Sequence, residues 1–493
     1  MASNLQMLKQ VRAVTSLIAQ TTDNAGHKSL LSVADIYLNN LLLQQAPQFY
    51  LDLVAQGRAL VEEGVSLAAK SGAKLQLQLP PEPIAPLHLD SRMEAIDAYI
   101  EALFDRMVAI IGLLDESRSA QEKDFLVRVS RWESRFYKHS TEDASTTAPV
   151  KAKEITQEGL QTYLEKKFPQ WKYVKVNKFV VLEGGISKKT ILFETHDSVN
   201  GAQSLVMRAE QPCNLLNYDG SRVALEFYSI KAMHQAGMPV AEPLWVEEDA
   251  SHLGNCFLVS RKAEGKPIGG NFGPYEPLTP GQLESYLSNF FKLHSIRLDP
   301  ADPVVQKSHL KVWSRFRTTT EADHFFVTET LPQLISRGQV RTTPQIARAM
   351  KWLEKNVPVN DEPPVIIHID YAFNNMIFDG DRMTALLDWE TTRLGDPAND
   401  FIWTQINLGL YSMEEFRQKY FDGTGRYVSD YRIAYAQITK CMINLIAGWT
   451  GAQFIDSDDS APLHMGVMAY KFMPMLCPDI DGLIAAAEAA KGK

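Results

Sequence analysis

Cysteine is scarce in this chain. Only four cysteines occur in 493 residues, and they are far apart: Cys213, Cys256, Cys441 and Cys477. No C-x-x-C pair and no dense disulfide framework is present. Four cysteines could in principle form two disulfides, but this spacing favours free thiols in a reducing compartment.

The chain also lacks targeting and membrane-spanning signals. Its first residues, Met1 to Leu5, carry neither the basic nor the apolar region of a secretory signal. No stretch approaches the roughly 18 apolar residues that a bilayer span requires. We therefore expect a cytoplasmic protein that does not act at a membrane.

Positive charge is in deficit as well, because the formal net charge is −9. An acidic chain is a poor general binder of nucleic acid or of anionic lipid, so neither is expected as a partner. An anionic small molecule is not excluded, since a local basic pocket can oppose the global charge. The length and the hydrophobic share of 45% are typical of a folded chain with two or three domains.

The N-terminal part is predicted to be all helical. Apolar residues recur at three- and four-residue spacing through 4–75, and a proline-rich connector occupies 79–86. Ser91 and Glu94 form a capping-box signature that predicts the start of a long helix. We find no catalytic constellation in 1–137 and expect a helical domain that serves packing, oligomerisation or partner binding.

A change of pattern follows the small polar residues of 138–154, which we predict to be a linker. Residues 155–263 contain several strand-like runs, whereas helices dominate 264–493. A sheet-rich lobe followed by a larger helical lobe predicts an α+β fold class.

One segment of the helical lobe carries the chemistry. It contains His-x-Asp-x-x-x-x-Asn as His368, Asp370 and Asn375, and Asp388 and Glu390 follow in Leu-Asp-Trp-Glu. Strand-like runs bracket both clusters at Val365–Ile367, Met376–Phe378 and Ala385–Leu387. Charged residues at the ends of buried strands are well placed to form a site.

Phosphoryl transfer needs these residue types. A carboxylate must lie beside the acceptor hydroxyl, and Asp370 is the natural base. Mg²⁺ prefers carboxylate and amide oxygens, so Asn375 and Asp388 are predicted as metal ligands. Glu390 either reaches the metal or an acceptor group, or anchors the loop. The spacing is that of protein kinases, with Ile369 in place of the usual Arg. His368 is expected to orient the loop rather than to act as a base.

Three motifs in order make a resemblance specific: 368–371 (His-Ile-Asp-Tyr), 387–390 (Leu-Asp-Trp-Glu) and 394–400 (Leu-Gly-Asp-Pro-Ala-Asn-Asp). The sequence resembles the aminoglycoside phosphotransferase and choline kinase-like family, in particular the branch of kinase domains attached to acyl-CoA dehydrogenases. The resemblance covers about 155–480. It implies a bilobal protein-kinase-like fold, with a kinase N-lobe at 155–263 and a C-lobe at 264–493. It also implies ATP- and Mg²⁺-dependent transfer to a hydroxyl of a small molecule, for which a hydroxyacyl-CoA is one candidate.

Two departures from the family pattern affect the expected activity. Ile369 replaces the usual Gly after His368, and Ala372 stands where many relatives carry Arg. A β-branched residue narrows the backbone options beside Asp370. An inactive pseudokinase scaffold with a partner-binding helical domain therefore remains the alternative.

The nucleotide side is predicted from the sheet-rich lobe. Gly184 and Gly185 lie between two strands, where glycines let backbone amides approach phosphates and Ser187 or Lys188 can add donors. A plain hairpin turn is the alternative for this segment. The third strand supplies Arg208, the cation that a kinase needs there.

Other residues complete the predicted site. Glu226, on the helix after the third strand, is the expected carboxylate partner of Arg208, with a surface ion pair as the alternative. Ser260 and Lys262 lie in the predicted hinge, where backbone groups would hold adenine. Asp396 and Asp400 are expected to fix the catalytic loops, and His294 to be a structural histidine.

Overall fold

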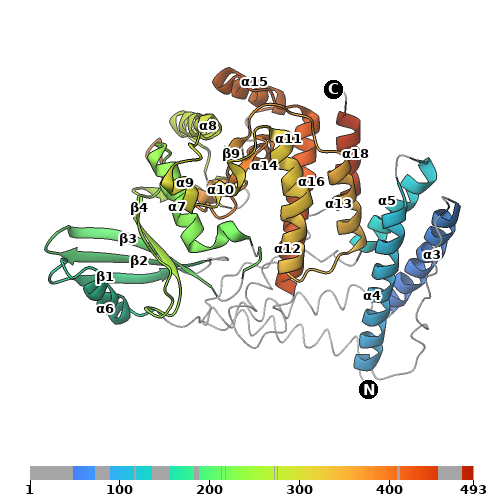
Figure 1. Cartoon of the computed structure of the whole chain (residues 1–493), viewed down its shortest axis with the longest axis horizontal. Helices are drawn as coiled ribbons and strands as arrows, with labels where there is room; N and C mark the ends of the chain where they lie inside the picture. The colour runs from blue at the N-terminus through green and yellow to red at the C-terminus, as the bar shows by residue number, and fades with distance from the viewer. Residues whose placement is uncertain are drawn as a thin grey trace.

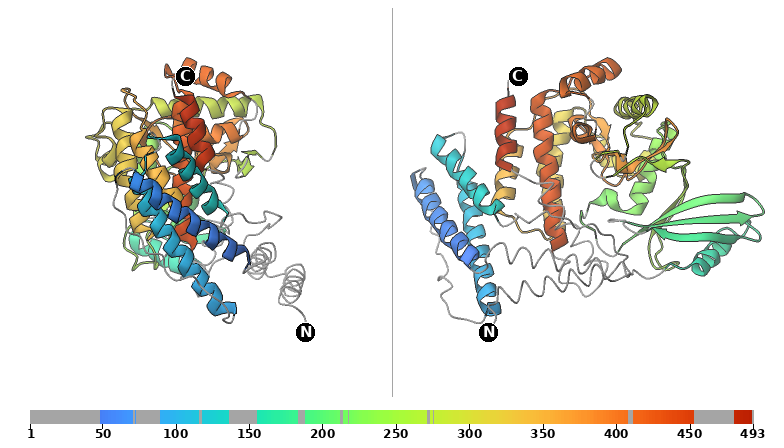
Figure 2. Two further views of the ribbon diagram at one scale, coloured as in Figure 1. Left: turned by 90° about the vertical axis from the view of Figure 1, so that its right-hand side faces the viewer. Right: turned by 180° about the vertical axis from the view of Figure 1, so that it is seen from behind.

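The computed structural model describes residues 48–70, 72, 89–115, 118–135, 155–182, 188–211, 214–216, 218–270, 273–274, 276–407, 411–452 and 480–491. The predicted linker 138–154 and the connector 79–86 lie outside these residues. Figures 1 and 2 show the main sheet at one end of the molecule and the N-terminal helices at the opposite end. Within the described part of the chain, no helix is both long and apolar enough to cross a bilayer.

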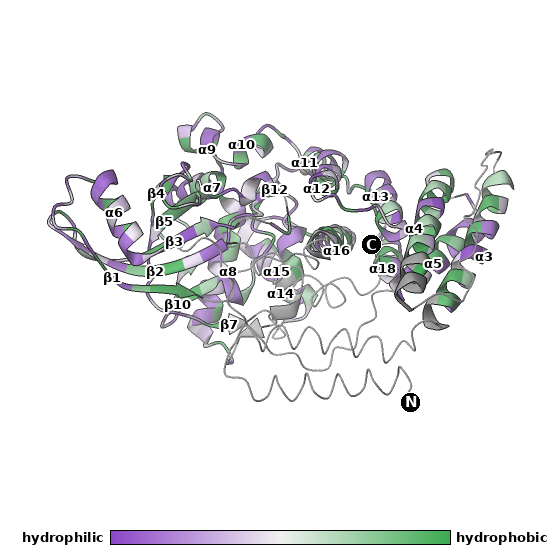
Figure 3. Ribbon diagram, turned by 90° about the horizontal axis from the view of Figure 1, so that it is seen from below, coloured by the Kyte–Doolittle hydropathy of each residue, from purple (hydrophilic) through white to green (hydrophobic). Residues whose placement is uncertain are grey.

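Three N-terminal helices form a unit with its own core: α3 (Gln48–Lys70), α4 (Leu89–Leu113) and α5 (Ala120–Ser134). Buried side chains such as Leu103, Phe125 and Trp132 fill the space between them. Figure 3 shows hydrophobic and hydrophilic residues alternating along these helices, as amphipathic packing requires. The prediction of Ser91 as the N-cap is wrong, because α4 already begins at Leu89. The two positions differ by two residues, the size by which fraying commonly shifts a helix end.

The N-lobe is built on a five-stranded antiparallel sheet in the order β1-β2-β3-β5-β4. Its strands are β1 (Lys175–Leu182), β2 (Lys188–Asp197), β3 (Gly201–Glu210), β4 (Pro243–Glu247) and β5 (Phe257–Arg261). The buried residues alternate along β2 and β3, as a strand with one face in a core demands.

Two helices pack on this sheet. Helix α6 (Gln157–Lys167) shares one hydrophobic cluster with Ile191, Phe193 and Met207. Helix α7 (Val223–Gln235) belongs to the larger cluster that joins β5 to the C-lobe. The core of the N-lobe therefore continues directly into the C-lobe.

The C-lobe is mostly helical. Its helices are α8 (Pro280–Ser295), α9 (Pro303–Lys307), α10 (Leu310–Trp313), α11 (Thr319–Phe325), the π-helix η2 (Phe326–Thr330), α12 (Leu331–Arg337), α13 (Pro344–Lys355), α14 (Ala398–Asn407), α15 (Met413–Thr424), α16 (Asp430–Ala452) and α18 (Ile480–Ala490). The α+β bilobal fold with a helical N-terminal part is the one predicted.

Short strands carry the motifs of the helical lobe. β9 (Val365–Ile367) pairs with β12 (Arg393–Gly395), and β10 (Met376–Asp379) pairs with β11 (Arg382–Leu386). The strand-like runs seen in the sequence are thus confirmed, although β11 begins three residues earlier than Ala385. β10 also pairs with β6 (Lys266–Pro267), which follows the N-lobe.

Gly265 marks the passage between the lobes. Its φ is +101°, and a Cβ there would lie 2.0 Å from the Phe378 carbonyl oxygen. Only glycine fits such a close approach of two backbones. The Thr384 hydroxyl donates to the neighbouring Glu264 carbonyl at 2.6 Å, which adds a side-chain bond at the same place.

The N-terminal unit lies against helix α13 of the C-lobe. The ammonium of Lys351 donates to three carbonyls at the end of α4, those of Ile111, Gly112 and Leu114, at 2.5–3.2 Å. The Glu133 carboxylate accepts from the Gln345 amide at 2.7 Å. These contacts end one helix and begin another, so the unit and the C-lobe share their helix caps.

Candidate active site

The loop after β9 positions the predicted base. The Asn375 amide nitrogen donates to the Asp370 carboxylate at 2.8 Å and to the Asp370 carbonyl at 2.9 Å. The Asn374 amide in turn donates to Asn375 Oδ1 at 3.0 Å. The carboxylate of Asp370 is therefore held in one orientation by a residue five positions further along the loop.

Asp400, at the start of α14, fixes the backbone of the same loop. Its carboxylate accepts from the amides of His368 at 2.9 Å and Ile369 at 2.6 Å. His294 Nε2 lies 3.0 Å from the same carboxylate, and His294 Nδ1 lies 3.0 Å from the Tyr420 hydroxyl. All of these groups are buried. The structural roles expected for Asp400 and His294 are confirmed.

Ile369 adopts the left-handed conformation, with φ of +71°. A β-branched residue is rarely found there, because its side chain crowds the backbone at a cost of about 1–2 kcal/mol. This backbone explains why a Gly is usual at the position. Ile369 is nevertheless buried beside Val365 and Ile367, which offsets part of the strain.

His368 connects the catalytic loop to the second motif. Its Nε2 lies 3.0 Å from the Leu387 carbonyl oxygen, so this nitrogen carries the proton and donates. The ring is fully buried and packs edge-on against Trp389, with centroids 4.8 Å apart. Burial lowers the pKa of His368, so the imidazole stays neutral. A buried, neutral donor orients a loop and is badly placed to take a proton from a substrate.

Arg208 of β3 joins the N-lobe to Asp388. Its guanidinium lies 2.5 Å from Glu226 of α7 and 3.1 Å from Asp388 Oδ1. A surface ion pair was the alternative, but Glu226 is fully buried. Asp388 itself has a φ of +67°, a turn conformation that Asp tolerates better than most residues.

Lys188 makes the second link between the lobes. Its ammonium lies 3.0 Å from Glu390 Oε2, and the Lys188 side chain is only 2% exposed. The N-lobe thus contributes two cations, Lys188 and Arg208, and the site gathers three carboxylates, those of Glu226, Asp388 and Glu390, around them.

The charges of this cluster shift one another. Burial raises the pKa of Glu226 to about 7, against the attraction of Arg208 and Lys188. Burial acts in the same direction on Asp388, but Arg208 outweighs it and holds the pKa of Asp388 below its ordinary value. Burial would lower the pKa of Lys188, and Glu390 reverses this effect. The cluster therefore combines two cations with Asp388, Glu390 and a Glu226 that is only partly ionised near neutral pH.

The donor set fits a hard divalent cation. Asn375 and Asp388 offer an amide and a carboxylate oxygen, and the Asp388 side chain is 31% exposed. Among the described residues, no group of three or more His, Cys, Asp or Glu side chains could hold a metal by itself.

The structure describes only some of the residues that were predicted to bind the nucleotide. Gly184, Gly185 and Ser187 lie outside the described residues. Ser260 lies in β5, paired with Val206 of β3. The Lys262 amide donates to the Ser204 carbonyl at 2.9 Å, while its side chain is exposed. Their nucleotide roles stay predictions.

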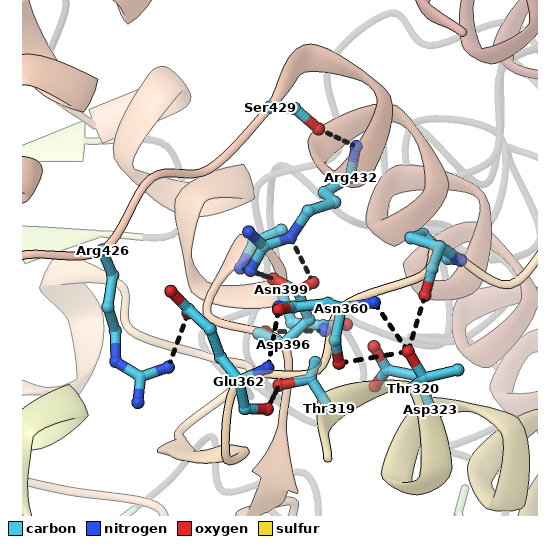
Figure 4. Close-up of polar contacts among 12 residues, drawn as sticks. Thr319, Thr320, Asp323, Asn360, Glu362, Asp396, Asn399, Arg426, Ser429 and Arg432 are labelled. Atoms are coloured by element: carbon cyan, nitrogen blue, oxygen red, sulfur yellow. Dashed lines mark hydrogen bonds and ion pairs between the residues drawn. The ribbon is translucent and has the colours of Figure 1, made fainter. Parts of the chain in front are cut away.

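Asp396 lies in a second polar network. The sequence motifs contained Asp396 but did not indicate its partner on α16. Arg432 of α16 donates two hydrogen bonds to the Asp396 carboxylate, at 2.6 and 2.8 Å (Figure 4). The Ala398 amide also donates to this carboxylate, at 2.8 Å. This confirms the structural role expected for Asp396. Nothing in the sequence pointed to Arg432, which is 36 residues away.

A buried ion pair extends the same network. Arg393 of β12 lies 3.3 Å from Asp323 of α11, and its guanidinium stacks 4.1 Å from the Phe326 ring centroid. A cavity is lined by these residues together with Asp396 and Arg432, away from Asp370 and Asp388. Its lining residues include Asp396 and Arg432, which hold the loops, and neither Asp370 nor Asp388.

Known sequences are similar to part of the chain. The model of the phosphotransferase enzyme family matches residues 180–436, a little more than half of the chain. Acyl-CoA dehydrogenase family member 11 of Gallus gallus is 26% identical over 237 residues, and that of Mus musculus is 26% identical over 212 residues. The matches cover 44% and 41% of this chain but only 28% and 25% of those proteins. A probable acyl-CoA dehydrogenase of Arabidopsis thaliana is 22% identical over 272 residues, which cover 49% of this chain and 32% of that protein.

Solved structures show similarity at low identity. A putative aminoglycoside phosphotransferase from Ralstonia eutropha is 18% identical, with a TM-score of 0.47, and the match covers 69% of this chain and all of that one. A spectinomycin phosphotransferase in complex with ADP and its antibiotic is 12% identical, with a TM-score of 0.44, over 68% of this chain and 99% of that one.

Proposed function

Because the chain belongs to the phosphotransferase enzyme family, we propose that it transfers the γ-phosphoryl group of ATP to a hydroxyl group of a small molecule. The observation that carries this proposal is the His368–Leu387 hydrogen bond, which ties the loop of Asp370 to the turn of Asp388. A proton acceptor and a metal ligand are thereby fixed relative to each other before any substrate binds. Such preorganisation supplies most of the catalysis in phosphoryl transfer.

Each residue of the site has a role in this scheme. Asp370 accepts the proton of the acceptor hydroxyl, and Asn375 keeps the carboxylate aimed at it. Asp388 and Asn375 would hold Mg²⁺, which when bound neutralises charge on the β- and γ-phosphates. Arg208 lies beside Asp388 and offers its planar fork to nucleotide phosphate.

We further propose a hydroxyacyl-CoA as the acceptor. The relatives named acyl-CoA dehydrogenases support this choice, because they are similar to 44–49% of this chain. Phosphorylation turns a hydroxyl into a good leaving group, which suits a step before elimination or reduction of an acyl chain. Aminoglycosides, choline and sugars are the acceptors against which it must be tested.

The test is a screen of ADP release by the full chain with Mg²⁺ and ATP. Hydroxyacyl-CoAs, aminoglycosides, choline and sugars are offered in parallel. The proposal expects release that depends on one acceptor class, and Asp370→Asn to lower it by roughly 10²–10⁴-fold, the usual contribution of a general base. Asp379→Asn, at an exposed position at the end of β10, is the matched control. Equal rates in the two variants would contradict the role of Asp370.

A further inference from the structure

The peptide that precedes Asp370 is held from two sides. Asp400 takes the amides of His368 and Ile369, as described above. On the other side, the ammonium of Lys440 lies 3.4 Å from the carbonyl oxygen of Ile369. This carbonyl belongs to the peptide bond between Ile369 and Asp370, so the position of Lys440 bears directly on where the Asp370 backbone lies.

Lys440 reaches this carbonyl from a well-anchored helix. Tyr431 and Tyr435 of α16 donate their hydroxyls to carbonyls of α13 and the residue after it, those of Asn356 and Leu353, at 2.5 and 3.0 Å. Arg432 ties the same helix to Asp396. The start of α16 is therefore fixed on two sides. Lys440 lies further along the same helix, where its side chain reaches the loop.

The loop needs these hydrogen bonds because Ile369 has a strained backbone conformation. Its φ of +71° is strained for a β-branched residue, and strain of this kind persists only where the surroundings fix it. A peptide released from one of its bonds would relax toward an ordinary conformation and carry the next residue, Asp370, with it. A glycine at this position would have no strain to release.

We propose that Lys440 is a positioning residue, which holds the Ile369 carbonyl and so keeps the Asp370 carboxylate in place. In this chain it compensates for the isoleucine at a left-handed position. The catalytic consequence rests on the proposed function of Asp370, whereas the effect on the loop does not. The two consequences are therefore measured separately.

The first measurement is the kinetics of the full chain with Lys440→Met and Lys440→Arg. Misplacement of a catalytic group costs on the order of 10–100-fold, so Lys440→Met should lower kcat by about tenfold. The KM for ATP should stay within about twofold, because the peptide does not belong to the nucleotide side. Lys440→Arg, which keeps the donor, should recover most of kcat. Lys311→Met, at an exposed position on α10, is the control.

A double-mutant cycle tests the compensation. In an Ile369→Gly background the strain is gone, so Lys440→Met should lower kcat by less than about threefold. The same loss of kcat in both backgrounds would overturn the proposal, and so would an equal change of kcat and KM without rescue by arginine.

The second measurement does not need activity. Amide hydrogen exchange across 368–371 should become at least about tenfold faster in Lys440→Met than in the wild type, and the difference should shrink in the Ile369→Gly background. Unchanged exchange would overturn the proposal even in an active enzyme. If the wild type releases no ADP with any acceptor, the proposed function fails, and the exchange data still decide the role of Lys440.

Discussion

Lys188 and Glu390 are 202 residues apart in the chain, yet the Lys188 ammonium lies 3.0 Å from Glu390 Oε2. From the sequence, Lys188 was predicted to donate to phosphates, and Glu390 either to reach the metal or an acceptor group or to anchor the loop. In the structure they bond to each other, so the first residue of β2 is linked to the residue that follows Trp389. The pair therefore helps to set how the N-lobe lies over Asp388.

Removal of one partner of this pair should be costly. Lys188→Met leaves Glu390 without its cation in a largely buried place, and such losses destabilise proteins by about 3 kcal/mol. Urea denaturation of the two proteins measures the difference. The double variant Lys188→Met with Glu390→Gln should be more stable than Lys188→Met alone. Strictly additive effects would show that the pair contributes nothing as a pair.

Asp400 should control activity without touching a substrate. In Asp400→Asn an amide NH₂ replaces one carboxylate oxygen, so the amide of either His368 or Ile369 loses its acceptor. We expect kcat to fall by about 100-fold, as for other misplaced catalytic groups, with little change in the KM for ATP. Steady-state kinetics measure both. Asp422→Asn, at an exposed position on α15, should behave as wild type.

His309 makes stability depend on pH. Burial lowers its pKa to about 4, and its Nε2 accepts from the Trp313 indole at 2.9 Å. In the unfolded chain the imidazole of His309 is protonated as the pH falls through about 6.5. In the folded protein it is protonated only as the pH falls through about 4. The stabilisation is thus complete above pH 6.5 and is lost as the pH falls, by about 3 kcal/mol in total.

The experiment compares wild type with His309→Gln, which keeps an acceptor for Trp313 but cannot titrate. Unfolding free energies from pH 4 to 7 give a difference between the two proteins. This difference should rise with pH and level off above 6.5. Groups such as Glu226, whose raised pKa acts in the opposite sense, cancel in the comparison. A difference that is independent of pH would rule out the assignment to His309.

The N-terminal unit should add stability to the C-lobe through Lys351. The ammonium of this residue caps the end of α4 from helix α13. Lys351→Met leaves three carbonyls without their charged donor, and we expect a loss of about 1–2 kcal/mol. Thermal unfolding measures it, and Lys166→Met, at an exposed position on α6, is the control. If Lys351→Met melts like the control, the docking contributes no stability at this point.

The sequence predicted the local structure around the candidate site, because short apolar runs mark its strands. Asp370 and Asp388 follow the short strands β9 and β11, and Asn375 directly precedes β10, so the apolar runs of these strands marked their positions. Even the distant partners Arg208 and Glu226 were paired correctly, because the order of strand and helix in a kinase lobe restricts the choice.

The remaining features depend on the tertiary arrangement. Nothing in the local sequence around Lys188 or Lys440 tells which backbone or carboxylate they reach. The departure at Ile369 was visible in the sequence, but its φ of +71° and the bonds that hold it were not.

The central claim is that Asp370, Asn375 and Asp388 form one site for magnesium nucleotide. Isothermal titration of the full chain with ATP, in the presence and absence of Mg²⁺, tests it most directly. We predict a heat of binding that depends on Mg²⁺ and that Asp388→Asn weakens by at least about tenfold, since a charged ligand of the metal is lost. Absence of any heat with magnesium nucleotide, or equal binding by Asp388→Asn, would contradict the account.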